Sequence, residues 1–306
     1  MTPESRSAAI SLPSPSRRDL RAHAAHRTVR LIERMGLYAL LTLLGLLFSL
    51  PFLWMLSTSF KTDPQVYRVP PIWIPNPIRL ANYPEALASQ PFGLYAVNTL
   101  KIAVPCTIGT VFSCAVVAYG FARLRWRLRD PLFFLCLATM MIPYQVVMIP
   151  LFITFKHLGW INSFRPMIIP SFLGNPYYIF MLRQFFMTIP QDLSDAAKID
   201  GCNEVRTMWS IILPLAKPAL AVVALFTMMW AWNEYLEPLI YINDPQLFPI
   251  ALGLQNMRAS YANVTRTLIW PYLMAASTAT ILPVLVLFFF TQRTFIEGIT
   301  VTGIKG

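Results

Sequence analysis

Charged residues are scarce in this chain, because Asp, Glu, Lys and Arg together make up 13% of its 306 residues. Hydrophobic residues make up 56%, and the mean hydropathy is +0.53. A soluble globule of this length needs more polar side chains than this to cover its surface. The composition therefore excludes an ordinary soluble domain and predicts a polytopic membrane protein.

Cysteine and histidine are also rare, with four and three residues respectively. Three of the cysteines lie inside apolar runs, and only Cys202 lies in a polar segment. No CxxC pair occurs, so neither a disulfide nor a zinc site is predicted. His23 and His26 have no third ligand beside them and are expected to be solvated. The chain is therefore not predicted to bind a metal or another cofactor.

Nucleotide-binding and catalytic motifs are missing as well. The sequence contains no Gly-x-x-x-x-Gly-Lys-Ser/Thr, so the chain is not expected to bind ATP through a phosphate-binding loop. It also contains no nucleophile elbow, no HExxH and no clustered pair of carboxylates. A polytopic membrane enzyme is the alternative class, and it would need one of these constellations. We therefore expect a protein that is not itself an enzyme.

Long apolar runs are what the chain does contain. A helix rises about 1.5 Å per residue, so about 20 apolar residues cross a hydrocarbon core about 30 Å thick. Six runs are long enough, which predicts an all-α protein with six transmembrane helices, although Gly174, Asn175 and Pro176 interrupt the fourth. The predicted spans cover residues 36–56, 93–121, 131–155, 166–186, 218–237 and 267–290.

Lys and Arg are distributed unequally between the segments that separate these runs. With the amino terminus inside, sixteen fall on the inner side of the membrane and seven on the outer side. Because Lys and Arg favour the cytoplasmic side, both termini are predicted to be cytoplasmic. Four arginines between residues 123 and 129 place that turn inside. The net charge of +11 thus reflects membrane topology and does not indicate a nucleic-acid partner.

The first 30 residues differ in composition from the rest. They are rich in Ser, Pro, Ala and Arg and have no apolar period, which predicts a disordered cytoplasmic tail. No small-residue cleavage pattern follows the first apolar run, so the stretch is not a secretory signal. The remaining residues, 31–306, are predicted to form the transmembrane permease domain.

The polar segment 190–217 lies between two of the apolar runs. Pro190 is suited to open a short helix that continues to Asp200, and Gly201 is suited to end it. Asn203 is expected to cap a second helix, and Pro214 to turn the chain toward the fifth span. In this second helix, five residues at helical spacing are expected to share one face. They are Val205, Met208, Trp209, Ile212 and Leu213.

This segment reads Asp-Ala-Ala-Lys-Ile-Asp-Gly from Asp195 to Gly201, and Leu213-Pro214 follows. It resembles the EAA loop of the membrane subunits of bacterial ABC importers, which inserts into a cleft of the ATPase subunit. Asp195 stands where that family usually has Glu, and Cys202 where it usually has Ala. The alternative is an amphipathic helix pair on the membrane surface. The resemblance implies that the ATPase-coupling residues are Asp195, Ala196, Ala197, Lys198, Asp200, Gly201, Cys202, Leu213 and Pro214.

Other short motifs extend the resemblance over most of the chain. Asn82-Tyr83, the run from Ala118 to Arg123, and Trp232-Asn-Glu-Tyr-Leu236 are similar to carbohydrate importer permeases, in particular the second membrane subunit of the maltose type. The resemblance implies a type I ABC importer fold in a prokaryotic plasma (inner) membrane. The implied partners are a different permease, two ATP-binding subunits that hold ATP and Mg, and an extracytoplasmic solute-binding protein. The implied cargo is a di- or oligosaccharide, and the alternative is a glycerol phosphate compound.

Polar and aromatic residues inside the runs are candidates for the substrate pathway. A carboxylate such as Glu234 costs about 2.5 to 3.5 kcal/mol near the centre of a bilayer, which invites a functional reading. It also fits an interfacial aromatic belt in which one carboxylate is hydrogen-bonded. The pathway candidates are Asn98, Tyr144, Gln145, Asn175, Tyr177, Tyr178, Trp232, Asn233 and Glu234.

Two outward segments leave a further choice open. Residues 61–91 and 238–266 either receive the solute-binding protein or cap the transmembrane helices, and the sequence favours neither.

Overall fold

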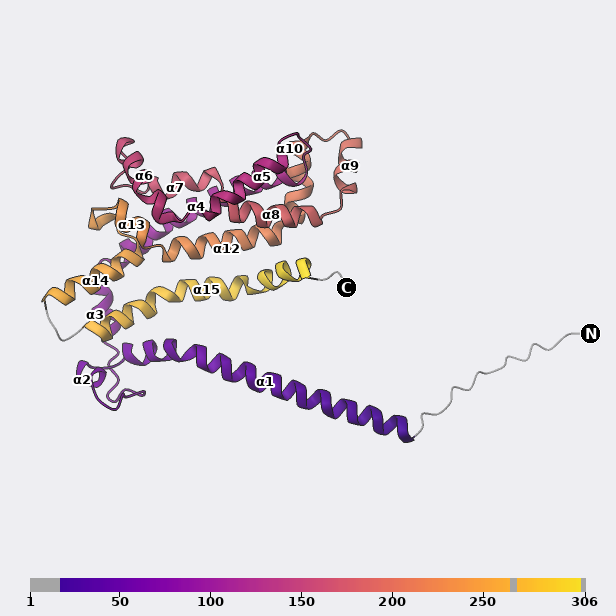
Figure 1. Cartoon of the computed structure of the whole chain (residues 1–306). Coiled ribbons are helices and arrows are strands. Elements are labelled where there is room, and N and C mark those ends of the chain that lie inside the picture. Colours follow the sequence, from indigo (N-terminus) through magenta and orange to yellow (C-terminus); the bar gives the residue numbers. More distant parts are fainter. Residues whose placement is uncertain (1–16, 265–268, 304–306) are drawn as a thin grey trace, which may run out of the picture. The chain divides into compact units, whose positions relative to one another are not determined.

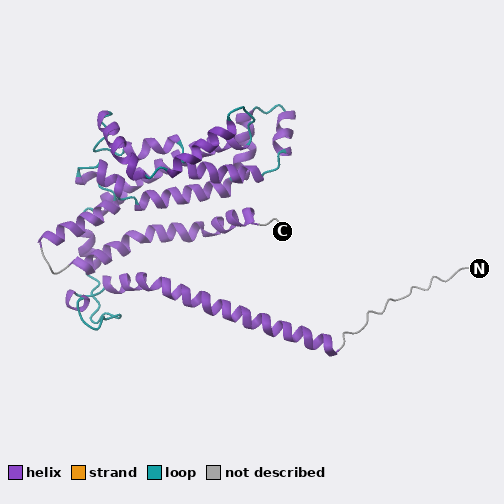
Figure 2. Cartoon of the chain, viewed as in Figure 1, coloured by secondary structure: helices purple, strands orange, loops and turns teal. Residues whose placement is uncertain are grey.

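The computed structural model describes the backbone of residues 17–264 and 269–303, and the side chains of residues 31–259 and 270–292. Within these ranges every regular element is a helix (Figure 2). The chain divides into two compact units, Met1–Met55 and Leu56–Gly306. Because their relative placement is not determined, we describe each unit by itself.

The first unit contains most of α1 (Arg17–Ser59). Its segment Leu31–Ser59 is long and apolar enough to cross a membrane, as predicted for the first span. The helix begins at Arg17, inside the stretch that was expected to be disordered. The first 16 residues of that stretch lie outside the described residues.

The second unit is built around α4 (Phe92–Ala122), which corresponds to the predicted second span. Against it pack α8 (Pro176–Thr188) and α12 (Lys217–Asn233), and α15 (Ile269–Gly303) packs on α12 (Figure 1). Small residues such as Cys114 and Ala118 are fully buried between these helices. A Cβ atom added to Gly109 would lie 2.6 Å from the Phe172 ring, so this position requires glycine for close approach.

The predicted third span, 131–155, is bent and is not a single straight helix. It consists of α5 (Arg129–Ala138), a 3-10 turn η1 (Thr139–Met141) and α6 (Tyr144–His157), and the axes of the two parts differ by 95°. Ile142 is extended, with ψ of 115°. Since the residue before a proline avoids the helical conformation, Pro143 explains where the helix breaks.

The fourth and fifth spans are also broken. The fourth is divided into α7 (Arg165–Ile168), the 3-10 turn η2 (Ile169–Leu173) and α8, and Gly174 at the break has φ of +93°. The fifth ends with α12, and α13 (Leu236–Tyr241) follows in a new direction (Figure 1). Within the described residues three helices are long enough to span a membrane. The number is five if two bent pairs, α5–η1 with α6 and Glu204–Leu215 with α12, each count as one span.

The two ends of α4 meet different loops. At its carboxyl end, Arg123 donates a hydrogen bond to Gln191 of the 190–217 segment. At its amino end, Asn98 donates to the Gln246 carbonyl oxygen, in the 3-10 turn η4 (Pro245–Leu247) that precedes α14 (Ile250–Val264). The arginine turn and the segment 190–217 therefore lie at one end of the helix and the loop after α13 at the other, as the alternation of sides predicted.

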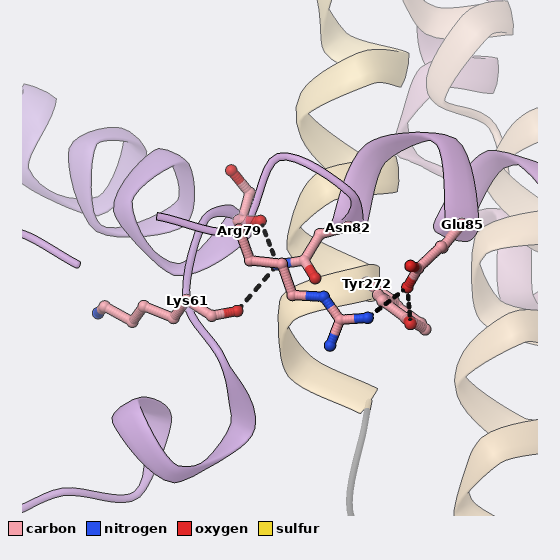
Figure 3. Close-up of polar contacts among 6 residues, drawn as sticks. Lys61, Arg79, Asn82, Glu85 and Tyr272 are labelled. Atoms are coloured by element: carbon pink, nitrogen blue, oxygen red, sulfur yellow. Dashed lines mark hydrogen bonds and ion pairs between the residues drawn. The ribbon is translucent and has the colours of Figure 1, made fainter. Parts of the chain in front are cut away.

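Residues 61–91 form an ordered cap that includes α2 (Asp63–Val66) and α3 (Asn82–Ala88). The Asn82 amide donates to the carbonyl oxygens of Ser59 and Lys61, each at 2.8 Å, and Arg79 pairs with Glu85 at 2.8 Å (Figure 3). Tyr272 of α15 donates to the same Glu85 carboxylate. These bonds fix the segment onto the end of α15, so it does cap the helices, and whether it also receives the solute-binding protein stays a prediction.

Candidate functional site

The segment 190–217 folds into two short helices joined by glycine. The first, α9 (Asp192–Ile199), ends where Gly201 adopts φ of +80°. The Cys202 N–H then donates to the Ala197 carbonyl at 2.9 Å, and the Gly201 N–H to that of Lys198 at 3.0 Å. This pair of bonds closes a helix with a left-handed residue. The predicted glycine end is confirmed.

The second helix begins as predicted and then departs from the prediction. The Asn203 side chain accepts the Arg206 N–H at 2.8 Å and caps α10 (Glu204–Thr207). A π-helical turn, η3 (Met208–Ile212), follows and has wider spacing than an α-helix. Met208 and Ile212 are buried as expected, but Val205 and Trp209 are 64% and 51% exposed. The expected single apolar face was therefore wrong.

The chain does not turn at Pro214 as expected. Pro214 lies inside the short helix α11 (Leu213–Leu215), and the direction changes by 79° at Ala216, before α12. Proline is tolerated in the first turn of a helix because its missing N–H has no partner to bind there. The bend falls one residue before Lys217, and Pro218 again occupies the first turn of the new helix.

The two alanines of the coupling motif differ in exposure on α9. Ala197 is only 3% exposed, whereas Ala196 is exposed. Leu193 and Ile199, which are 41% and 88% exposed, lie at helical spacing on either side of Ala196. These three residues form an outward apolar face with a small residue at its centre. Among the other predicted coupling residues, Asp195, Lys198, Asp200, Gly201 and Pro214 are exposed, and Cys202 and Leu213 are half-buried.

Arg123 fixes the beginning of α9 to the end of α4. Its guanidinium is 9% exposed and donates to the Gln191 side-chain oxygen at 2.8 Å and to the Ile189 carbonyl at 2.9 Å. Hydrogen bonds from a charged donor contribute about 1.5 to 3 kcal/mol each. Arg123 was predicted to lie on the inner side, but this contact was not predicted.

Glu204 forms a second connection between the segment 190–217 and the carboxyl end of α4. Its carboxylate accepts the Tyr119 hydroxyl of α4 at 2.8 Å and pairs with Lys198 of α9 at 2.9 Å. The bond from Lys198 and then that from Tyr119 lower the pKa of Glu204. Its contribution to stability is therefore complete at neutral pH and is lost only as the pH falls through this lowered value. A cleft of about 720 Å³ opens beside this connection, between Arg125, Trp126 and Asp195.

A second candidate site is a cavity of about 320 Å³ within the helices of the second unit. Three of the predicted pathway residues line it, namely Tyr144, Asn175 and Tyr178. The Tyr144 hydroxyl lies 3.4 Å from that of Tyr241, which comes from α13. The cavity is further lined by Cys106, Thr110, Leu151, Phe155, Pro166, Met167, Pro170, Ser171, Gly174, Thr227, Trp230 and Glu237.

The other pathway candidates lie elsewhere. Asn98 is buried against the Gln246 and Phe248 carbonyls, and Trp232 is buried and donates to the Thr280 carbonyl at 3.2 Å. Asn233 donates to the Met229 carbonyl of its own helix. Gln145 and Tyr177 are exposed. These residues serve local structure or surface in this conformation and do not line the cavity.

Glu234 has a local role that explains its place in the apolar run. Its carboxylate accepts the Glu237 N–H at 3.0 Å, at the break between α12 and α13. Glu237, which the sequence analysis did not single out, is the carboxylate that lines the cavity. The signal was present in the sequence, because Glu237 follows Glu234 at a spacing of three. Only the break in the helix shows which of the two faces inward.

The described residues contain no group of three or more His, Cys, Asp or Glu side chains that could hold a metal ion.

Residues 109–300 match the model of a family described as "Binding-protein-dependent transport system inner membrane component". The sulfoquinovosyl glycerol transport permease SmoH of Agrobacterium fabrum is 32% identical over 84% of this chain and 88% of its own length. The arabinooligosaccharides permease AraQ of Bacillus subtilis is 31% identical over 90% and 97%. The sn-glycerol-3-phosphate permease UgpE of Yersinia enterocolitica is 32% identical over 78% and 85%.

A solved structure has the same fold. It is a crystal structure of a bacterial ABC transporter involved in the import of the acidic polysaccharide alginate, and it superposes with a TM-score of 0.70 over 92% of this chain and 99% of its own. The two sequences are 24% identical, so this likeness concerns the fold.

Proposed function

The chain belongs to the inner-membrane components of binding-protein-dependent transport systems, and on this basis we propose that it is the permease subunit of an ATP-driven carbohydrate importer. The observation that supports this most directly is the α9–α10 segment, which exposes an apolar face around Ala196 and is tied to α4 through Arg123 and Glu204. Such a segment transmits a displacement of its docked partner into the transmembrane helices.

The coupling follows from the contacts along α4. When a partner ATPase binds α9 and moves it, the contacts of Arg123 and Glu204 transmit this movement to the carboxyl end of α4. Because α4 is a single helix of 31 residues, the movement reaches its amino end, where Asn98 holds the loop after α13. This loop follows the helix that supplies Glu237 and Tyr241 to the cavity. ATP closure on the partner would thereby change access to the cavity.

Energy and solute delivery are assigned to other chains. The sequence has no phosphate-binding loop, so ATP and Mg bind to two partner ATPase subunits. A second, different permease completes the pathway, and an extracytoplasmic solute-binding protein delivers the cargo. Residues 190–217 form the ATPase-coupling loop of the permease domain.

A carbohydrate is the cargo that fits the cavity best. Aromatic rings such as Trp230 and Tyr178 offer apolar faces for sugar C–H groups, and the surrounding hydroxyls offer hydrogen bonds. The names of two relatives, SmoH and AraQ, refer to sugar compounds. A glycerol phosphate is the second candidate, because UgpE is a relative of similar identity.

Uptake by the assembled transporter tests this proposal. Proteoliposomes that contain the chain, its partner permease and the ATPase subunits are given the loaded binding protein and radiolabelled solute. We expect a sugar to accumulate only with ATP and the binding protein present. Accumulation of glycerol phosphate alone would favour the second candidate. Uptake of any solute without ATP would contradict an ATP-driven importer.

Cys202 provides a direct test of docking. It is half-buried directly after Gly201, while Cys106 and Cys114 are buried within the helices. We expect Cys202 to form a disulfide with a cysteine placed in the cleft of the ATPase, and the yield to change by several-fold when ATP is added. The Cys202→Ser variant is the control and should give no crosslink. Failure at every position along the cleft would contradict docking through this loop.

A further inference from the structure

The lining of the central cavity has an unusual balance of charge. Glu237 is its one acidic side chain, and no Lys, Arg or His of the described residues lines it. The remaining polar groups are hydroxyls and one amide, and the rest of the lining is apolar or aromatic. Glu237 lies at the end of the predicted fifth span, and a carboxylate within a transmembrane segment indicates a function.

The break between α12 and α13 directs this carboxylate inward. Glu234 is extended, with ψ of 124°, and its side chain binds the Glu237 backbone N–H. Glu237 then lines both the central cavity and a smaller adjoining space, which Glu234 also lines. Two carboxylates thus lie at the same corner, and only Glu237 reaches the larger cavity.

The Glu237 carboxylate interacts differently with neutral and with anionic cargo. A carboxylate only accepts hydrogen bonds, so it can bind sugar hydroxyls, which donate. A phosphate or carboxylate group on the cargo would meet a like charge, with no lining cation to offset it. At about 5 Å and an effective dielectric constant of about 20, this repulsion corresponds to roughly a hundredfold in affinity.

We propose that Glu237 is a specificity-determining residue that makes the cavity accept uncharged carbohydrate and reject cargo bearing phosphate or carboxylate. This inference rests on the proposed function, since it identifies the substrate class of the same importer. It also decides between the two candidates above, because a glycerol phosphate belongs to the rejected class.

The rejection requires the negative charge, so it depends on pH. The other titratable groups that line the cavity are Cys106 of α4, Tyr144 of α6, Tyr178 of α8 and Tyr241 of α13, and none is cationic. Arg165 of α7, and Lys156 and His157 at the end of α6, are exposed and do not line it. As the pH rises and Glu237 loses its proton, the preference for neutral cargo should increase.

Binding to the assembled transporter without the binding protein isolates the selectivity of the cavity. The probes are cellobiose and cellobiouronic acid, which differ by one CH₂OH replaced by a carboxylate. Equilibrium dialysis at about pH 9, where a carboxylate is ionised, should show a preference for cellobiose of at least about tenfold. A ratio below about twofold, or no binding of either sugar at high millimolar concentration, would overturn the inference.

Two variants locate the effect. Glu237→Gln removes the charge and should reduce the preference by about tenfold. Glu234→Gln removes the same charge three residues away and should change the preference less. Equal shifts in the two variants would overturn the assignment to Glu237. These outcomes are independent of the importer proposal, because ATP-dependent sugar uptake with no selectivity in the cavity would leave that proposal standing.

Discussion

The variant Ala196→Trp should reduce ATP-dependent uptake by about a hundredfold while the chain still folds and inserts. Ala196 is exposed at the centre of the outward face of α9, between Leu193 and Ile199. Because Ala196 is exposed, an indole ring there can extend into solvent in the free chain, but it would fill the space that a docked ATPase must occupy. A steric clash of about 3 kcal/mol at such a contact corresponds to about a hundredfold in affinity.

The two neighbouring alanines allow a matched comparison. Ala196→Ser adds one atom at the same place and should retain most of the uptake. Ala197→Trp places the same ring where the side chain is 3% exposed, so it should disturb the folding of the segment itself. Proteolysis of the purified chain separates the two effects, because only the Ala197 variant should be cut faster than wild type. Normal uptake by Ala196→Trp would show that this face does not dock.

The parts of the fold that were predicted correctly depend on local chemistry. The spans that became α1, α4 and α15 are continuous apolar runs, and hydropathy alone identifies them. Gly201 and Asn203 were placed correctly because a left-handed residue and a side-chain cap are requirements of the adjacent backbone. No distant contact is needed for either prediction.

The sequence was least informative where a helix break lies inside a continuous apolar run. Segment 131–155 is apolar throughout, so hydropathy gives no sign that α5 and α6 are set at 95° to one another. Pro143 indicated a bend, but proline inside a membrane helix is also tolerated without a break, as Pro105 is within α4. Whether a proline bends or breaks a helix depends on the packing around it, which the sequence does not show.

The functional residues that were missed depend on contacts between distant segments. Tyr119 and Glu204 are 85 residues apart, and Arg123 reaches a carbonyl 66 residues away. The two alanines of the coupling motif could not be distinguished either, because their exposure depends on how α9 rests on its neighbours. Similarly, the inward direction of Glu237 follows from the break at Glu234.

Substitutions at Gly201 should give a graded loss of uptake that ends in complete loss with proline. No atom lies within 4 Å of a Cβ added here, so the backbone angle of +80° is the only obstacle. The left-handed conformation costs most L-residues about 1 to 2 kcal/mol, and Asn tolerates it better. Gly201→Asn should therefore retain most of the uptake, and Gly201→Ala should lose up to about tenfold.

Gly201→Pro should reduce uptake for two reasons that do not apply to the other variants. Proline fixes φ near about −65°, and it has no N–H to replace the bond to the Lys198 carbonyl. Without this closure, α9 cannot present Ala196 while Lys198 and Glu204 remain paired, so uptake should fall to background. ATP hydrolysis by the complex should then no longer respond to the loaded binding protein. The order Gly, Asn, Ala, Pro in both measurements follows from backbone conformation and, for proline, from the missing N–H. An order that instead followed side-chain size would contradict this account.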